Sequence, residues 1–225
     1  MNDIKIAGNK TIQQWVDIVG TKKNLKIDFY SNEKWDTIFE FFEERINTRY
    51  INPINAILNM HDNLGEGFAV VNLQCSLIET IESFINGCVH EYDVKSEKLK
   101  WKRNGRIIFH SNKSIFVSFF NKRTPFDILN ISGEDFYESV RCALLHETQT
   151  KNNWTIKLDS ENTGYSYLEK NGNYLIYREN FQRDLKKLID YYKNSIINGE
   201  YFHEIEPALL RENFISKFNN ICEKS

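Results

Sequence analysis

The sequence predicts a mainly α-helical bundle that carries a small antiparallel β insertion and short strands near its N-terminus. Over most of the chain apolar side chains recur every three or four residues, whereas over 151–178 they alternate or cluster as aromatics. A chain of 225 residues can also bury a core that needs neither disulfides nor metal. With 41% hydrophobic and 27% charged residues, wholesale disorder is excluded, and we expect a single domain over 1–225.

The first 30 residues are expected to form a β-like lead-in to the bundle. The runs 15–19 and 25–30 are predicted as short strands or as a hairpin. Gly20 and the polar residues 22–24 interrupt these runs, as turn residues do.

Two helices are predicted next. Ser31 or Asn32 can cap the first helix. Its apolar residues recur at helical spacing: Trp35, Ile38, Phe39, Phe42 and Ile46. Pro53 suits the first turn of a second helix, 52–60, because its missing N–H is not needed there.

A third helix, 64–86, is apolar around more than half of its circumference, so we expect it at the centre of the bundle. Its apolar residues are Val70, Leu73, Leu77, Ile78, Ile81, Phe84 and Ile85. A narrow polar arc remains, with Asn72, Ser76, Glu79 and Ser83. A carboxylate in so apolar a helix must be paired, hydrogen-bonded or functional, because an isolated buried charge is costly.

A basic segment follows this helix. Residues 95–123 hold nine Lys and Arg side chains and one acid, Glu97, so they carry a charge of +8, although the whole chain carries −2. Within the excursion 91–112, the runs 99–102 and 106–110 predict a hairpin around Asn104-Gly105. The candidate RNA-binding residues are Lys98, Lys100, Trp101, Lys102, Arg103 and Arg106. Such a cluster can attract phosphate and stack a base, and it can equally be a solvated surface.

Three more parts complete the predicted fold. A helix over 133–147 begins after Ser132, which can cap it. The insertion 151–178 holds three predicted antiparallel strands, at 154–158, 165–169 and 174–177. The C-terminal region 179–225 is predicted to form two helices, at 181–198 and 206–222.

The helix 133–147 has two faces. Its core face consists of Phe136, Val140, Ala143 and Leu144. At 100° per residue, Arg141 and His146 flank a second, partly apolar face with Cys142 and Leu145 at its middle. Such a face is expected to meet another subunit or another helix.

This spacing in a helical setting resembles the HEPN superfamily, whose ribonucleases carry an Arg-x4–6-His motif late in a helical bundle. The matching positions are Arg141 and His146, separated by Cys-Ala-Leu-Leu. The run from Gly65-Glu66-Gly67-Phe68 to Glu79 and the stretch 141–147 are also similar to bacterial helical proteins of this kind. The resemblance covers 34–200 loosely and implies a HEPN-like bundle.

The resemblance implies a metal-independent RNA endonuclease, usually a homodimer whose two motifs form one composite site. His146 would act as general base or acid, and Arg141 as a clamp on the phosphate. The RNA would be cut by 2′-hydroxyl attack, as by a toxin or an antiviral defence effector. Two alternatives remain open: a non-catalytic HEPN-like module for dimerisation or for binding nucleic acid or a partner, and a helical interaction protein in which the motif is coincidental.

One position departs from the family pattern. The residue after the arginine is often polar, and here it is Cys142, so other groups would have to orient the substrate. The candidate supporting residues are Glu79, Glu138, Cys142 and Asn72. No cofactor and no metal are expected; the expected partners are RNA, a second copy of the chain, and a neighbouring antitoxin or sensor protein.

The sequence favours a cytoplasmic protein without a membrane partner. Its first ten residues lack the apolar core of a signal peptide, and we expect no apolar run of about 18 residues that would span a bilayer. The four cysteines form no Cys-x-x-Cys pair and are predicted to be mostly small buried thiols. Cys75, Cys88 and His90 lack the spacing of zinc ligands.

Overall fold

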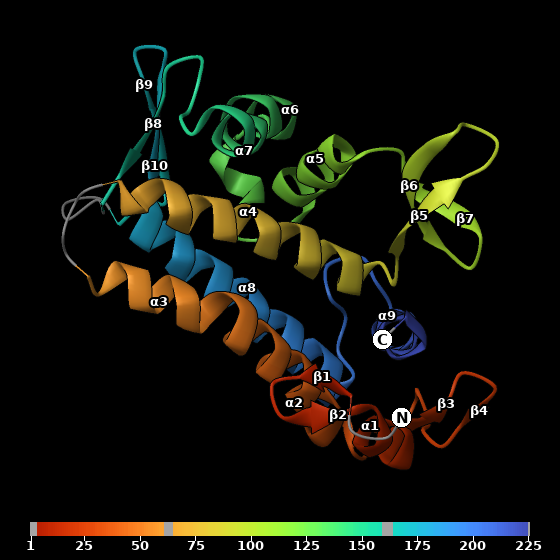
Figure 1. Ribbon diagram of the computed structural model, residues 1–225. Helices are drawn as coiled ribbons and strands as arrows, with labels where there is room; N and C mark the ends of the chain where they lie inside the picture. Colours follow the sequence, from red (N-terminus) through yellow and green to blue (C-terminus); the bar gives the residue numbers. More distant parts are fainter. Residues whose placement is uncertain (1–3, 61–64, 159–163, 225) are drawn as a thin grey trace. The chain divides into compact units, whose positions relative to one another are not determined.

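The computed structural model describes residues 4–60, 65–158 and 164–224 (Figure 1). Of these residues 57% are helical and 18% lie in small sheets, which confirms the mainly-α class. The chain divides into two compact units. Unit 1 comprises Met1–Asn52, Ile81–His110 and Tyr191–Ser225, and unit 2 comprises Pro53–Thr80 and Ser111–Asp190. Each is described by itself below, and the single domain stays a prediction.

Unit 1 begins with two small hairpins around a helix. Strands β1 (Lys5–Ala7) and β2 (Lys10–Thr11) pair antiparallel, as do β3 (Gly20–Thr21) and β4 (Asn24–Leu25). Between them lies α1 (Ile12–Val19), so the predicted strand at 15–19 is wrong.

A capping box explains this helix. The Thr11 hydroxyl accepts the N–H of Gln14, and the Gln14 side chain accepts the N–H of Thr11. The second predicted strand, 25–30, is also wrong beyond Leu25, which ends β4.

The first predicted long helix is confirmed as α2 (Trp35–Ile46), and its apolar residues are buried. Its start differs from the prediction: Lys34, with φ 68°, precedes it without a side-chain cap. The chain then continues through a π turn, η1 (Asn47–Ile51), into α3 (Asn52–Leu58). Pro53 therefore lies inside a continuous helical run.

The π turn η1 directly precedes this proline. The N–H of Asn52 donates to the carbonyl of Asn47, five residues earlier, so the helix is wider than an α-helix at this point. In an ordinary α-helix the proline ring would crowd the backbone of the preceding turn.

Aromatic side chains form the core of unit 1. Phe42 meets Phe84 edge-on at 4.8 Å between ring centroids, and Phe39 stacks on Phe214 at 5.6 Å. Phe214 belongs to α9 (Pro207–Lys224), which confirms the last predicted helix. Arg211, also on α9, donates from its buried guanidinium to main-chain carbonyls such as that of Ser31.

The basic excursion is a three-stranded antiparallel sheet in the order β5-β6-β7. The predicted hairpin is confirmed as β6 (Lys98–Arg103) and β7 (Arg106–Phe109), with positive φ at Asn104 and Gly105 as a tight turn requires. A further strand, β5 (Val89–Asp93), was not predicted.

Unit 2 contains the predicted helices and one further helix, α5 (Asn112–Lys122), that was not predicted. The central helix is α4 (Glu66–Ile85), of which residues up to Thr80 belong to this unit; residue 64, its predicted start, lies outside the described residues. After α5 and the turn η2 (Asp127–Leu129), the predicted helix 133–147 is present as one helical run. It consists of α6 (Gly133–Phe136), the π turn η3 (Tyr137–Cys142) and α7 (Ala143–Glu147).

The β insertion is a mixed sheet, not the antiparallel one predicted. Its strands are β8 (Trp154–Lys157), β9 (Tyr167–Lys170) and β10 (Asn173–Tyr177), in the order β8-β10-β9. The hairpin β9–β10 is antiparallel, but β8 runs parallel to β10. Alternation of side chains predicts strands and not their partners, which is why the parallel pairing of β8 with β10 was not expected. The helix after the sheet is α8 (Arg178–Asn198), as predicted.

One expectation about the membrane needs correction. By length and composition α4 can cross a bilayer, with a mean hydropathy of 1.3 over an 18-residue window. It is the only such helix among the described residues, and 61% of that window is buried. A core helix passes the same test, so this is weak evidence for a membrane span.

Candidate active site

Arg141 lies in η3, the π turn of the helical run 133–147. In a π turn each N–H bonds the carbonyl five residues earlier, so the residues no longer step by 100°. The faces assigned at 100° per residue therefore do not hold strictly within η3. The predicted core face is nevertheless buried: Phe136, Val140, Ala143 and Leu144. Single π turns are frequent at functional sites.

One ion pair ties Arg141 to α4. The Arg141 Nε donates to Oε1 of Glu79 at 3.0 Å, and the two side chains are 20% and 18% exposed. Neither Nη group of Arg141 has a protein acceptor among the described residues. The guanidinium is thus fixed on one side and open to an anion on the other.

Tyr137 supports the same guanidinium and was missed by the sequence analysis. The central carbon of the guanidinium lies 5.8 Å from the centre of the Tyr137 ring, within the range of a cation–π contact. Tyr137 precedes Arg141 by four residues, a helical spacing that would have suggested the contact.

The charge states of this cluster follow from burial and pairing. Burial raises the pKa of Glu79, and Arg141 offsets this only in part. Burial lowers the pKa of Arg141, but the Glu79 carboxylate and Tyr137 outweigh it, so this pKa lies above its ordinary value. Burial and a hydrogen bond with Cys142 raise the pKa of Tyr137 to about 12. Arg141 therefore stays cationic and Tyr137 stays neutral at physiological pH.

His146 lies on α7 and is exposed. No hydrogen bond or ion pair holds its ring within the described part of the chain. It follows Arg141 by five positions, which is about 7.5 Å along a helix axis. The structure thus places the two motif residues on one helical run, with the arginine fixed and the imidazole accessible.

The other candidate supporting residues are placed differently. The Glu138 carboxylate accepts from Lys113 Nζ at 2.9 Å, so it is engaged with α5 and not with Arg141. Asn72 is half-buried on α4, seven residues before Glu79. Cys142 is a half-buried free thiol next to Arg141.

Most of the candidate RNA-binding side chains in unit 1 have partners. Lys102 Nζ lies 2.6 Å from an Asp93 carboxylate oxygen, Arg103 donates to Asn213, and Lys100 donates to the carbonyl of His110 at 2.7 Å. These contacts engage the basic groups within the sheet, at its end and with α9.

The remaining three candidates divide by exposure. Trp101 is only 8% exposed and its ring stacks on His90 at 4.8 Å, so it does not offer the open stacking platform that was expected. Lys98 and Arg106 are exposed and have no partner among the residues described. They are the cations of the hairpin that remain available to a phosphate.

The chain matches no protein-family model, no curated protein and no solved structure. Its function therefore has to be inferred from the residues themselves. Across the described residues, no three or more His, Cys, Asp or Glu side chains are grouped as metal ligands. Unit 2 pairs the Arg141 guanidinium with a mostly buried carboxylate and carries an exposed imidazole five positions further along the same helical run. These groups have the chemistry to hold a phosphate and to move a proton.

Proposed function

We propose that the protein is a HEPN-type, metal-independent RNA endonuclease that acts as a homodimer in the cytoplasm. The observation that carries the proposal is the Arg141 guanidinium, which Glu79 orients through a single Nε–H bond while its Nη groups stay open. The exposed His146 follows on the same helical run. Such an activity suits a toxin or an antiviral defence effector restrained by a neighbouring antitoxin or sensor protein.

The proposed reaction needs only these side chains from two subunits. His146 of one protomer takes the proton of a ribose 2′-hydroxyl, and the 2′-oxygen attacks the adjacent phosphorus. The bond to the 5′-oxygen breaks, and that oxygen takes a proton from the second histidine. The products are a 2′,3′-cyclic phosphate and a 5′-hydroxyl. Arg141 donates its Nη hydrogens to the phosphate oxygens, where negative charge develops.

A composite site requires a face that pairs with itself. Leu145 is 50% exposed and directly precedes His146, and the half-buried Cys142 lies three residues before it. An exposed leucine beside the proposed catalytic histidine supports a twofold contact that would bring two copies of the motif together.

A non-catalytic module is the second candidate, and the Glu79–Arg141 pair itself favours it. A carboxylate that partly neutralises the arginine suits a structural strut as well as a catalytic clamp. In that case Arg141 and His146 would hold a dimer together or bind a partner without cleaving RNA.

Cleavage in the presence of a chelator separates the two candidates. The wild-type protein is incubated with total RNA in EDTA beside His146→Ala, Arg141→Ala and Arg141→Lys. We expect cleavage to fall by about 10²-fold or more in the alanine variants, as for the loss of a general acid–base or of an anion clamp. Arg141→Lys should recover little, because an ammonium group cannot keep both the Glu79 bond and the phosphate fork.

Matched controls lie elsewhere on the chain. His110→Ala and Arg49→Ala replace exposed residues of the same types and should leave cleavage unchanged. Glu79→Gln keeps the shape but loses the charge, and should lower the rate without abolishing it. Cleavage that persists in His146→Ala, or its absence from a folded, dimeric wild-type protein, contradicts the nuclease; the second outcome supports the module.

A further inference from the structure

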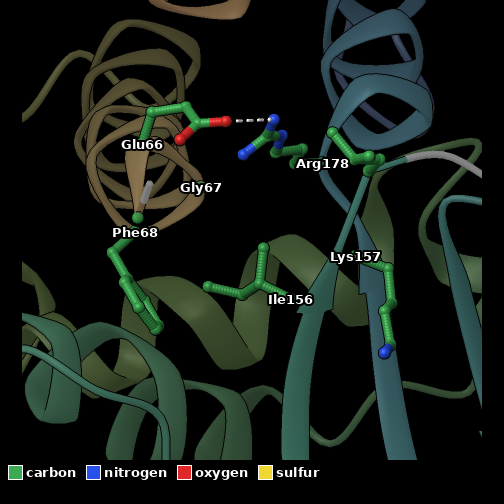
Figure 2. A pocket seen from close by; sticks show the side chains of 8 residues that line it. Glu66, Gly67, Phe68, Ile156, Lys157 and Arg178 are labelled. Atoms are coloured by element: carbon green, nitrogen blue, oxygen red, sulfur yellow. Dashed lines mark hydrogen bonds and ion pairs between the residues drawn. The ribbon is translucent and has the colours of Figure 1, made fainter. Parts of the chain in front are cut away.

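A cavity of about 280 Å³ lies where α4 and α8 begin, within unit 2. Figure 2 shows Glu66 and Arg178, the first residues of the two helices, facing each other above the side chains of Phe68 and Ile156. Leu158 adds further apolar lining. One end of the cavity is therefore polar and the other apolar, and its volume is at the lower limit for small-molecule sites.

Arg178 is only partly satisfied at the polar end. Its side chain is 7% exposed, and its Nη2 donates to Oε1 of Glu66 at 2.9 Å. Its Nε is buried and has no acceptor among the described residues. A buried N–H without an acceptor is uncommon in folded proteins, so the guanidinium keeps unused donor capacity at the polar end of the cavity.

The backbone of α4 is shaped to admit this guanidinium. A Cβ added to Gly67 would lie 2.8 Å from Nη1 of Arg178 and 3.3 Å from a methyl group of Ile156. Gly67 is buried, so any other residue there would push the guanidinium away or fill the cavity. The absence of a side chain at Gly67 therefore leaves room for Nη1 of the Arg178 guanidinium.

The position of the cavity at two helix starts, more than the side-chain charges around it, favours an anion. Glu66 and Arg178 cancel each other, and Lys157 on β8 adds an exposed ammonium that points away from the pair in Figure 2. At the N-termini of these two long helices the helix dipole attracts negative charge. The N–H groups of Phe68 and Glu179 already donate to the carbonyls of Gly65 and Leu158, so the other N–H groups of the first turns are the ones left for a ligand.

We propose that this cavity binds a small organic oxyanion, a carboxylate or a phosphate monoester carried on an apolar body. The oxyanion lies against the Arg178 guanidinium and the first turn of α4, and the apolar body covers Phe68 and Ile156. Glu66 holds the guanidinium in place for it. The site does not depend on the proposed nuclease, because its test measures binding alone.

Calorimetric titration with four probes tests the site: phenyl phosphate, benzoate, inorganic phosphate and benzyl alcohol. We expect phenyl phosphate or benzoate to bind at one site per chain, and the tighter of the two identifies the oxyanion. Inorganic phosphate lacks the apolar body and benzyl alcohol lacks the charge, so each should bind about tenfold more weakly or worse.

Variants locate the binding. Arg178→Lys and Gly67→Ala should each weaken it about tenfold, since one removes the planar fork and the other displaces it. Phe68→Ala should also weaken it, whereas Ile128→Ala and Lys170→Ala, exposed and outside the lining, should not. If Arg178→Lys does not fold, the binding measured with Gly67→Ala and Phe68→Ala shows whether the cavity is the site.

Three results would overturn the proposal. They are no saturable binding of either organic oxyanion, binding of benzyl alcohol or inorganic phosphate as tight as that of phenyl phosphate, and equal binding by the folded Gly67→Ala protein.

Discussion

A single hydrogen bond determines what Arg141 can do. Because only Nε donates to Glu79, the plane of the guanidinium is fixed and its outer donors are not consumed. A bidentate pair with Glu79 would have used an Nη donor as well as Nε. The free energy of such a partly buried pair is modest, since the cost of desolvation offsets the attraction. Glu79 therefore contributes more to the orientation of Arg141 than to the stability of the fold.

Lys217 is a buried lysine whose lowered pKa can be tested. Its Nζ donates to the carbonyl of Cys88 at 2.9 Å beside the ring of Trp101, and burial lowers its pKa to about 8. In the unfolded chain a lysine titrates near 10.4. Between these values the unfolded chain binds more protons, so this group makes stability rise with pH from about 8 upward.

We expect Lys217→Met to remove this rise. Between pH 8 and 10.5 the free energy of unfolding of the wild-type protein should increase, relative to that of the variant, by at most about 3 kcal/mol. Denaturant unfolding of both proteins at several pH values measures the difference. Parallel pH profiles would show that Lys217 is solvated in the folded state.

Two helical runs contain π turns, η1 before Pro53 and η3 at Arg141. Both widen the helix locally, and neither is visible in the spacing of apolar residues. In η3 the consequence concerns function, because the turn sets the direction of Arg141 relative to His146. A helical wheel drawn at 100° per residue finds the core face, but its angles do not hold for residues within η3.

The hairpin of β6 and β7 is the element to test for RNA binding. Only its exposed cations, Lys98 and Arg106, are free of partners among the described residues. Replacing both with alanine should weaken RNA binding and lower the slope of log affinity against log salt by about 1.4, or 0.7 for each lost phosphate contact on a single strand. Filter binding at several salt concentrations measures it.

The matched control replaces Lys23 and Arg49, which are also exposed in unit 1. That double variant should keep the wild-type slope. An equal loss of slope in both double variants would mean that the hairpin has no special role and that only net charge matters.

For the whole molecule, the proposed function requires a dimer. We expect sedimentation equilibrium at tens of micromolar to give twice the 26.7 kDa of one chain. Leu145→Asp should shift the mass to one chain by placing charge in the apolar contact, while the exposed control Ile128→Asp should not. A wild-type protein that stays at one-chain mass would remove the composite site.

The main features of the helices were predictable because burial leaves a periodic trace in the sequence. The apolar stripes of α2 and α8 are buried as expected. Local signals also worked for the Asn104-Gly105 turn and for Ser132, whose hydroxyl accepts the N–H of Asp135. Two predictions failed for physical reasons. A run of only eight residues, such as α1, is compatible with either a helix or a strand. The pairing of β8 with β10 depends on segments that are distant in the sequence.

The uninformative net charge of −2 illustrates the limit of composition. The sequence by itself determined the helical class, the position of Arg141 and His146 on one helix, and the basic hairpin. Only the tertiary structure decided that Arg141 pairs with Glu79, 62 residues away, that Trp101 is buried, and that Gly67 makes room for Arg178. The physical reason is that periodicity records which side chains leave water, whereas the partner that each polar group meets depends on how distant segments pack.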